Sequence, residues 1–271
     1  GAGGRRFKSR RPDILFLETG YFLLILLTND DGIHSRGIVT LGRHLSEKHD
    51  VYMVAPERER TCVAHAVTLH KPLRVRELSR GVYATNGTPA DCVLLGVHAV
   101  LPRRPDLVVS GINTGPNMGR DVNYSGTVAA AREGGFLGIP SMAVSVCARE
   151  GFLFDDAAGV ACIVVERLTE GVFLEGTVVN VNIPNLPRER LKGFSVTRLG
   201  KRIYNDIVHE RVDPRGRKYY WIGGNGERYE RRRGTDFYAV EKGYVSITPL
   251  GLDITDAGSM KIYQKHFRRL L

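Results

Sequence analysis

Short apolar runs alternate with helical patterns from residue 23 to about residue 185. The apolar run at 23–27 is followed by Ile38, Leu41 and Leu45 at helical spacing, and then by a second apolar run at 51–56. Periodicity alone does not separate a buried strand from a buried helix, but runs this short favour strands. A strand, a helix and a strand in close succession form the βαβ unit of a parallel sheet.

The same alternation continues along the chain. Further strands are predicted at 105–111, 140–146 and 177–184, and helices at 88–101, 125–138 and 155–171. Thr88 is the expected N-cap of the first of these helices, because Pro89 fits the first helical position. Repeated βα units predict the α/β fold class, with a doubly wound and mostly parallel sheet.

The pattern changes in the last third of the chain. Strand-like segments joined by long charged loops occupy residues 194–250, and a final helix is predicted to carry Ile262, Tyr263 and Phe267. An isolated two-stranded hairpin is only marginally stable in water, and exchange of identical elements between subunits stabilises such arms at low cost. We therefore expect a core at 23–190 and a smaller β-rich region at 191–271, whose β-hairpin arm and terminal helix form a homodimer or homotetramer.

Residues 1–22 are basic and precede an apolar run, as in a secretory signal peptide. Glu18, Thr19 and Gly20 interrupt the apolar stretch, and no small-residue cleavage site follows. We therefore expect residues 1–22 to be an N-terminal extension outside the domain. Because no stretch is long enough to span a bilayer, no membrane partner is expected.

The 271 residues carry a net charge of +10, which would suit a polyanionic partner. Because no nucleic-acid-binding motif is found, a solvated basic face is the preferred explanation and no specific nucleic acid is expected. The four cysteines have no C-x-x-C spacing: Cys62, Cys92, Cys147 and Cys162. This scatter argues against a zinc site or a disulfide framework and favours a cytoplasmic location.

Two adjacent carboxylates, Asp30 and Asp31, directly follow the first apolar run and its Thr-Asn link. Ligands of open α/β sheets bind beyond the carboxyl ends of the strands. Two other predicted strands lead into loops that offer oxygen atoms at this edge: the loop after 51–56 offers Thr61, and the loop after 105–111 offers Asn113. Carboxylate, hydroxyl and amide oxygens suit Mg²⁺, Mn²⁺ or Ca²⁺. The alternative is a solvated turn that caps the next helix. Because two like charges side by side must be neutralised, we prefer a metal site.

Ser125, Gly126 and Thr127 open the predicted helix at 125–138. A helix N-terminus presents free N–H groups and a positive dipole end to an anion. A plain N-cap by Ser125 explains the same residues equally well, and no Walker A motif occurs in the chain. Carboxylates that hold a cation beside a helix N-terminus suit a phosphate ester and its hydrolytic water. We assign these three residues, together with Asn29, to the phosphate of a substrate.

Five motifs in this order resemble the stationary-phase survival protein SurE family of metal-dependent nucleotidases. They are LLTNDDGIHSRGI, VAPERERT, NGTPADCV, VSGINTGPNMGRDVNYSGTVAAAREG and YVSITPL. The resemblance covers residues 23 to about 250. It implies a Rossmann-like core, one divalent ion (Mg²⁺ or Mn²⁺), and hydrolysis of nucleoside 5′- and 3′-monophosphates to nucleoside and phosphate. Some members of the family also cleave short polyphosphate.

The resemblance also implies roles for single residues. Asp30 and Asp31 match the paired metal ligands and are the expected catalytic residues, and Asn113 matches the amide ligand. Thr61 stands where the family usually has serine, and its hydroxyl still supplies an oxygen. The nucleophile stays open between a water, with an aspartate accepting its proton, and an aspartate itself. Residues 195–240 and the last helix are similar to the arms that the family exchanges between subunits.

A phosphoacceptor receiver domain also places an acidic pair after its first strand and binds Mg²⁺. Its central strand ends in an aspartate, whereas this chain reads VVSGINTG there and has no carboxylate until Asp121. The chain is also far longer than such a domain. The nucleotidase hypothesis is therefore preferred over a signalling module and over a nucleic-acid-binding protein.

Overall fold

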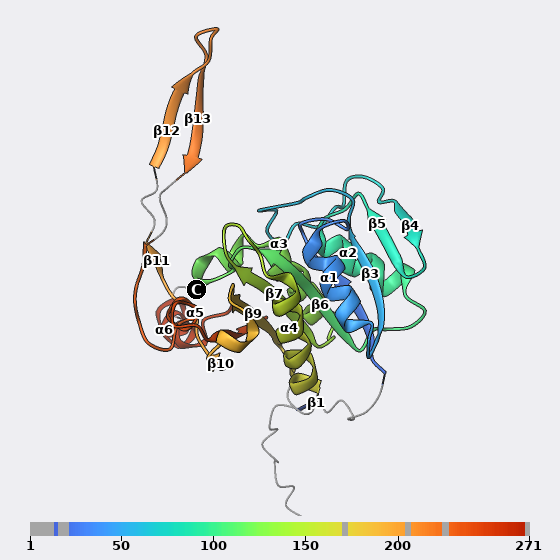
Figure 1. The fold of residues 1–271 in the computed structure, drawn as a ribbon. Helices are drawn as coiled ribbons and strands as arrows, with labels where there is room; N and C mark the ends of the chain where they lie inside the picture. Colours follow the sequence, from blue (N-terminus) through green and yellow to red (C-terminus); the bar gives the residue numbers. More distant parts are fainter. Residues whose placement is uncertain (1–13, 16–21, 170–172, 204–206, 224–227, 269–271) are drawn as a thin grey trace, which may run out of the picture.

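The computed structural model describes residues 14–15, 22–169, 173–203, 207–223 and 228–268. Its main feature is a nine-stranded sheet with the strand order β10-β15-β9-β7-β6-β2-β3-β5-β4 (Figure 1). These strands are β2 (Leu24–Thr28), β3 (Asp50–Pro56), β4 (Val75–Ser79), β5 (Val82–Thr85), β6 (Leu107–Thr114), β7 (Ser141–Cys147), β9 (Thr177–Pro184), β10 (Phe194–Val196) and β15 (Val245–Gly251). The helices are α1 (Arg36–Leu45), α2 (Pro89–Leu95), α3 (Gly126–Phe136), α4 (Phe154–Thr169), α5 (Asp236–Glu241) and α6 (Ala257–Phe267).

The central strands confirm the predicted doubly wound α/β fold. Six neighbouring strands, β5, β3, β2, β6, β7 and β9, run parallel. The chain starts at β2, moves outward through β3 to β5, and then returns to the other side of β2 with β6, β7 and β9. This is the Rossmann strand order, and its direction reverses between β2 and β6. The carboxyl ends of these two strands are therefore where a ligand is expected.

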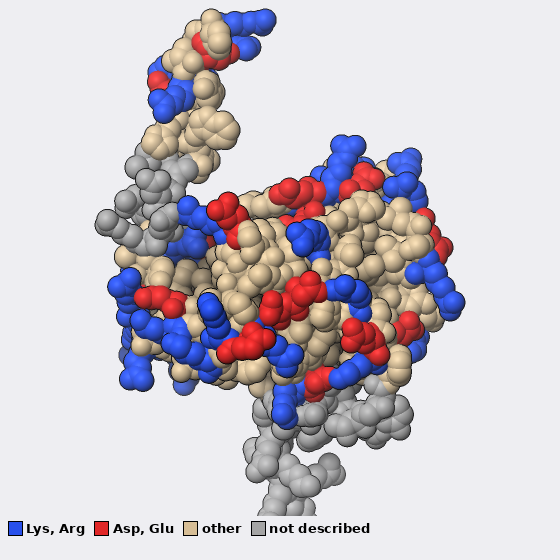
Figure 2. All heavy atoms as spheres, in the orientation of Figure 1, with Lys and Arg blue, Asp and Glu red and all other residues tan. Residues whose placement is uncertain are grey.

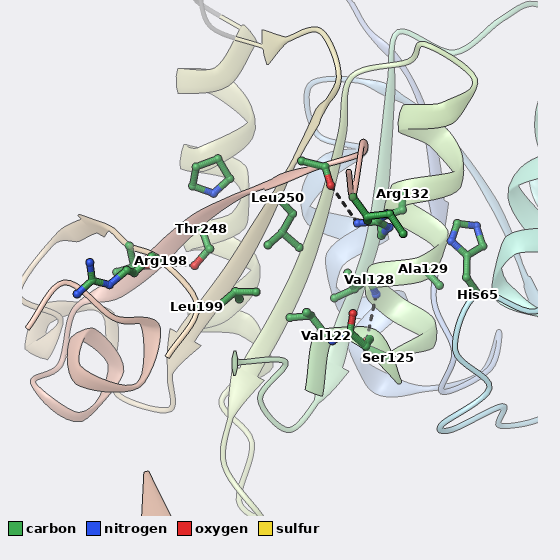
Figure 3. Close-up of a pocket in the computed structure, with 15 residues that line it drawn as sticks. His65, Val122, Ser125, Val128, Ala129, Arg132, Arg198, Leu199, Thr248 and Leu250 are labelled. Atoms are coloured by element: carbon green, nitrogen blue, oxygen red, sulfur yellow. Dashed lines mark hydrogen bonds between the residues drawn. The ribbon is translucent and has the colours of Figure 1, made fainter. Parts of the chain in front are cut away.

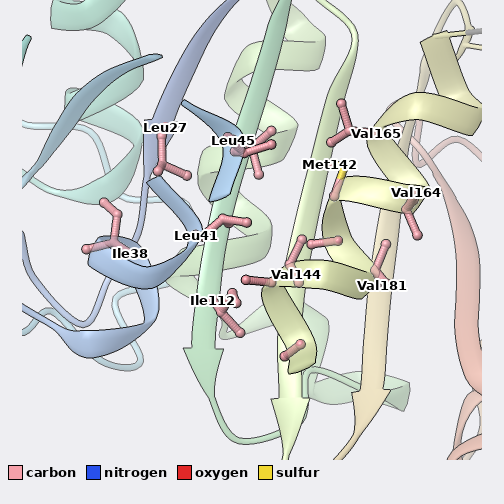
Figure 4. Close-up of a cluster of buried hydrophobic side chains, with 14 of the residues drawn as sticks. Leu27, Ile38, Leu41, Leu45, Ile112, Met142, Val144, Val164, Val165 and Val181 are labelled. Atoms are coloured by element: carbon pink, nitrogen blue, oxygen red, sulfur yellow. The ribbon is translucent and has the colours of Figure 1, made fainter. Parts of the chain in front are cut away.

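Two layers of helices cover the sheet and account for the apolar pattern of the sequence. All five residues of β2 are buried, as a central strand covered on both faces requires. On one face, Ile38, Leu41 and Leu45 of α1 and the apolar side of α4 form the largest core cluster with the sheet (Figure 4). On the other face, α2 and α3 contribute to two smaller clusters. Thr88 caps α2 as predicted, since its side chain accepts a hydrogen bond from the Asp91 N–H.

β6 is longer than the strand predicted at 105–111. It continues to Thr114, so Asn113 lies in the strand and pairs with Ser145 of β7 after a register shift. Gly111 suggested the end of the strand, but its role is close packing. A Cβ at this position would lie 2.5 Å from the carbonyl oxygen of Val144. Pairing with β7, which the local sequence does not reveal, extends the strand.

The region after residue 190 has two structural parts. β15 pairs antiparallel with β9, and β10 pairs with β15, so both belong to the main sheet. The hairpin of β12 (Ile207–Val212) and β13 (Lys218–Gly223) projects from the body of the molecule, above the short pair β11 (Arg202–Ile203) and β14 (Arg228–Tyr229) (Figure 1). α6 buries none of its residues. The predicted strand segments and the final helix are thus present.

The N-terminal extension contributes one short element to the described structure. β1 (Ile14–Leu15) pairs antiparallel with β8 (Phe173–Leu174), which follows α4. The remaining residues of the extension, apart from Phe22, lie outside the described part of the chain. Within the described residues, no helix is both long and apolar enough to cross a membrane.

Candidate metal and phosphate site

Asn29 shapes the turn that follows β2. Its Nδ2 donates to the carbonyl oxygen of Gly32 (3.0 Å) and to the hydroxyl of Ser35 (2.8 Å), and its Oδ1 accepts from the Gly32 N–H (3.2 Å). Gly32 adopts a φ of +98°, which favours glycine. The chain therefore leaves the extended conformation between the two aspartates and α1. The amide of Asn29 is used in this turn, and its contact with a substrate phosphate stays a prediction.

Asp30 is buried against the first turn of α3. Its Oδ1 accepts a hydrogen bond from the Thr127 hydroxyl, and the Thr127 backbone N–H also stabilises the carboxylate. Burial raises the pKa of Asp30 to about 6, and the neighbouring charge of Asp31 adds to this rise, while the hydrogen bonds to Thr127 oppose it. The charged form of Asp30 is therefore costly in the protein without a nearby cation.

Asp31 joins the ends of β2 and β6. Its two carboxylate oxygens accept hydrogen bonds from the backbone N–H (3.2 Å) and the hydroxyl (3.1 Å) of Thr114. Burial raises the pKa of Asp31, the Thr114 hydrogen bonds oppose the rise, and the charge of Glu59 adds to it. Thr114 and Glu59 were not singled out in the sequence. A threonine at a strand end and a glutamate in a charged loop have no pattern that separates them from ordinary surface residues.

The loop after β3 brings Thr61 to the same edge of the sheet. The Arg60 N–H donates to the carbonyl oxygen of Asp30 (2.7 Å), which fixes the preceding part of the loop beside the aspartates. Thr61 is exposed, and its hydroxyl donates to a carboxylate oxygen of Glu59. The loop thus lies against the aspartates, while the described contacts do not join the Thr61 hydroxyl to either carboxylate.

Asn113 approaches from β6, one residue before Thr114. Its Nδ2 donates to the carbonyl oxygen of Gly115 (2.8 Å), which leaves Oδ1 as the atom that can serve a cation. Since Thr114 binds Asp31, the strand places Asn113 next to a residue that touches the acidic pair. The predicted ligands therefore come from three neighbouring strand ends, as the parallel sheet requires.

The N-terminus of α3 completes the site. Ser125 caps the helix, its Oγ accepting from the Val128 N–H (3.1 Å). Gly126 lies so close to the aspartate that an added Cβ would be 2.8 Å from Cβ of Asp30. Only glycine allows this approach of the helix to the carboxylate. Because Thr127 is engaged with Asp30, an anion at this helix end would meet Ser125 and Gly126 first.

The residues at this edge fit a hard divalent cation. The predicted ligands offer two carboxylates, a hydroxyl and an amide oxygen, and these atom types suit Mg²⁺ or Mn²⁺. Within the described residues, no Lys or Arg forms an ion pair with Asp30 or Asp31, and no group of three or more His, Cys, Asp or Glu side chains is arranged to hold a metal. A cation here would therefore depend on hydroxyl and amide oxygens beside the acidic pair.

A cavity of about 790 Å³ runs along α3 from Ser125 to Arg132 (Figure 3). Val128 and Ala129 of α3 line it, together with Leu250 of β15. Arg132 closes one end by donating to the carbonyl oxygen of Gly251 (3.1 Å). Ser125 belongs both to this cavity and to the helix N-terminus, so the cavity begins beside the predicted phosphate site.

Comparison with known proteins gives the family directly. The family model described as Survival protein SurE matches residues 25–206. The chain belongs to the SurE family. It is 48% identical over 241 residues to the 5′-nucleotidase SurE of Geobacter sulfurreducens, covering 89% of this chain and 92% of that one. It is 50% identical over 239 residues to the 5′-nucleotidase SurE of Pelobacter propionicus, covering 88% and 97%.

A solved structure agrees with this assignment. The SurE protein from Aquifex aeolicus is 44% identical and superposes with a TM-score of 0.82, over 90% of this chain and 99% of that one. The resemblance inferred from the five motifs is thus confirmed. Membership of the SurE family also removes the receiver-domain alternative, because the family model matches residues 25–206. Lys and Arg are interspersed with Asp and Glu on the face shown in Figure 2.

Proposed function

We propose that this SurE protein is a 5′-nucleotidase that uses one divalent cation, Mg²⁺ or Mn²⁺, to hydrolyse nucleoside monophosphates to nucleoside and phosphate. The observation that carries the proposal is the acidic pair Asp30–Asp31 at the switch point of the sheet, packed against the N-terminus of α3. The relatives named 5′-nucleotidase SurE support it, since they share nearly half of their residues with this chain.

Two groups of residues have different roles in hydrolysis: one holds the cation and the other contacts the phosphate. Asp30 and Asp31, with the oxygens of Thr61 and Asn113, would hold the cation. When bound, the cation polarises the phosphoryl oxygen and lowers the pKa of a water. Ser125 and Gly126 face the substrate phosphate, where the positive helix end stabilises the charge that develops on the transferring group. One of the two aspartates accepts the proton of the attacking water.

Thr127 and Thr114 act through the aspartates. Each binds one carboxylate, Thr127 that of Asp30 and Thr114 that of Asp31. These hydrogen bonds stabilise the charged carboxylates and fix their orientation, as outer partners of metal ligands generally do. The cavity beside Ser125 provides room for the nucleoside part of the substrate.

The wider scope of the proposal includes cleavage of 3′-monophosphates and of short polyphosphate. It also includes assembly into a dimer or tetramer through residues 191–271, with the core at 23–190. A cytoplasmic location remains part of the proposal, and the four cysteines, which are free in the structure, are compatible with it.

A phosphate-release panel tests the proposal. The purified protein is offered 5′-AMP, 3′-AMP, tripolyphosphate, a sugar phosphate and p-nitrophenyl phosphate, each with Mg²⁺, with Mn²⁺ or with EDTA. We expect release from nucleoside monophosphates that requires metal and is abolished by EDTA. Release that is unchanged in EDTA would contradict the metal site, and a preference for the sugar phosphate would contradict the nucleotidase activity.

A further inference from the structure

Asp236 is a completely buried carboxylate in the region after residue 190. It accepts three backbone hydrogen bonds: from Gly119 (2.7 Å) through Oδ2, and from Gly200 and Phe237 (both 2.8 Å) through Oδ1. A carboxylate has acceptor sites on both oxygens and no donor, so it can accept N–H groups from two other segments and from its own helix α5. Residues this buried and this fully bonded hold their partners in fixed relative positions.

Gly119 is the partner that leads toward the site. It starts the 3₁₀ helix η2 (Gly119–Asn123), which runs directly into Tyr124 and the N-cap Ser125. It also lies six residues after Asn113. Asp236 therefore binds the middle of a connecting segment. This segment runs from Asn113, the predicted amide ligand of the metal, to Ser125 at the predicted phosphate-binding helix end.

The contact at Gly119 has no spare room. Its φ is +56°, and a Cβ there would lie 2.7 Å from the carbonyl oxygen of Gly200 and 2.8 Å from the Phe237 ring. A second link lies next to it: Arg202 pairs with Asp121 of η2 (3.2 Å) and lies over the Phe237 ring. Any change in Asp236 is thus transmitted to η2 through packed backbone atoms.

The same segment is also held from the sheet side. The Asn117 N–H donates to Oδ1 of Asn182 (2.9 Å), and its carbonyl oxygen accepts from Nδ2 of Asn180 (2.8 Å) and of Asn182 (2.9 Å). Its own Nδ2 donates to the Ser145 hydroxyl (2.9 Å). Residue 117 is therefore fixed by buried polar side chains of β7 and β9. Residue 119 is fixed by Asp236, which belongs to the C-terminal region.

We propose that Asp236 is a positioning residue for phosphate hydrolysis, acting through Gly119 and η2 to hold the Ser125–Gly126 helix end against Asp30. This inference rests on the proposed nucleotidase function. The tolerance at the helix end is small, since a Cβ on Gly126 would overlap Asp30. A displacement of about 1 Å at a reacting centre can cost on the order of 100-fold in rate. The C-terminal region thus contributes to catalysis as well as to assembly.

The first test compares Asp236→Asn with Asp213→Asn. Asp213 lies in the turn of the projecting hairpin, where its Oδ1 accepts from the backbone N–H groups of Arg215 (2.8 Å) and Arg217 (2.9 Å). The chemical change and the backbone N–H contacts are matched, whereas Asp213 also pairs with Arg217 (2.8 Å) and does not contact the segment at 117–121. We expect Asp236→Asn to lower kcat/KM for 5′-AMP on the order of 10- to 100-fold, and Asp213→Asn to stay within about twofold of wild type.

The measurement must separate positioning from loss of folded protein. Both variants are assayed well below their melting temperatures, with circular dichroism and light scattering recorded on the same samples. Product inhibition by inorganic phosphate is the deciding readout, because a displaced helix end weakens phosphate binding even when all of the protein is folded. We expect the inhibition constant for phosphate to rise in Asp236→Asn and to stay unchanged in Asp213→Asn.

A double-mutant cycle tests the route through Gly119. Gly119→Ala places a methyl group against the Gly200 carbonyl oxygen and the Phe237 ring and so disturbs the same contact from the other side, and it should reproduce the kinetic defect of Asp236→Asn. The double variant should lose little more than the worse single variant, whereas independent sites would multiply their effects. Should Asp236→Asn fail to fold, Asp236→Glu keeps the carboxylate and displaces it by one methylene, and it should show the same rise in the phosphate inhibition constant.

The outcomes distinguish this inference from the proposed function. Folded Asp236→Asn with wild-type kcat/KM and phosphate inhibition would overturn the positioning role, and so would fully multiplicative effects in the cycle. A wild-type protein that releases no phosphate would instead contradict the nucleotidase proposal. In that case, calorimetric titration of wild type and Asp236→Asn with inorganic phosphate still decides whether Asp236 positions the helix end.

Discussion

In β2, the side chains of Ile25, Leu26 and Leu27 are completely buried, whereas in β13 the side chains of Trp221 and Ile222 are 66% and 91% exposed. Both strands are rich in apolar residues, but only β2 has neighbours on both sides and helices on both faces. The core therefore gains its stability within one chain, and the acidic pair Asp30–Asp31 follows the end of its central strand β2. The hairpin of β12 and β13, called the arm from here on, exposes apolar groups that are available to a partner surface.

The first prediction concerns the acidic pair that follows β2 in the core. Replacing Asp31 by Asn removes one charged oxygen of the proposed metal site, while Thr114 can still donate to the remaining oxygen. We expect phosphate release from 5′-AMP to fall at least about 100-fold, since loss of an outer partner of a ligand alone typically costs 10- to 100-fold. Steady-state kinetics with saturating Mg²⁺ or Mn²⁺ checks this, with circular dichroism as the control for folding. Wild-type turnover would refute the metal site.

The second prediction concerns the arm. Replacing Trp221 and Ile222 together by Ser should shift the assembly toward smaller species, raising the dissociation constant at least about tenfold, as loss of two buried apolar contacts predicts. The matched control is Val39→Ser, which changes a half-exposed apolar residue on α1. Light scattering over a concentration series measures the effect. A wild-type chain that is a stable monomer at micromolar concentration would contradict the role of the arm.

The third prediction separates catalysis from stability at Asp30. Because burial raises its pKa to about 6, the charged carboxylate destabilises the metal-free fold above that pH. In EDTA, Asp30→Asn should be as stable as wild type or melt about 2–4 °C higher, which corresponds to roughly 1 kcal/mol in a chain of this size. The gain should be largest above pH 6 and should disappear as the pH falls toward 4, where the wild-type carboxyl is neutral. A lower melting temperature at pH 7 would contradict this.

The smallest effect is expected at Thr61, which is exposed and lies at the edge of the site. Thr61→Ser keeps the hydroxyl oxygen and should leave the activity close to wild type. Thr61→Ala should raise the metal concentration for half-maximal rate roughly threefold to tenfold, the effect of losing one polar contact. Titration of activity with Mg²⁺ and Mn²⁺ measures this. If Thr61→Ala responds to metal like wild type, Thr61 is not a ligand.

The sequence predicts local features well where the pattern depends on near neighbours. The apolar run at 23–27 indicates a buried strand, and α1 buries Ile38, Leu41 and Leu45, as their spacing requires. The N-cap role of Ser125 follows from residue type and position. The acidic pair is visible because two adjacent carboxylates after an apolar run are unusual in themselves.

The partners of the acidic pair were decided by tertiary structure alone. Thr114 is 83 positions away from Asp31, and Thr127 is 97 positions away from Asp30. Asp236 reaches Gly119 across 117 positions. These contacts depend on which strand lies beside β2 and on how closely α3 approaches it, and local propensities do not encode either. The sequence thus determined which residues could carry the chemistry, whereas the order of the strands and the packing of glycines determined which of them meet.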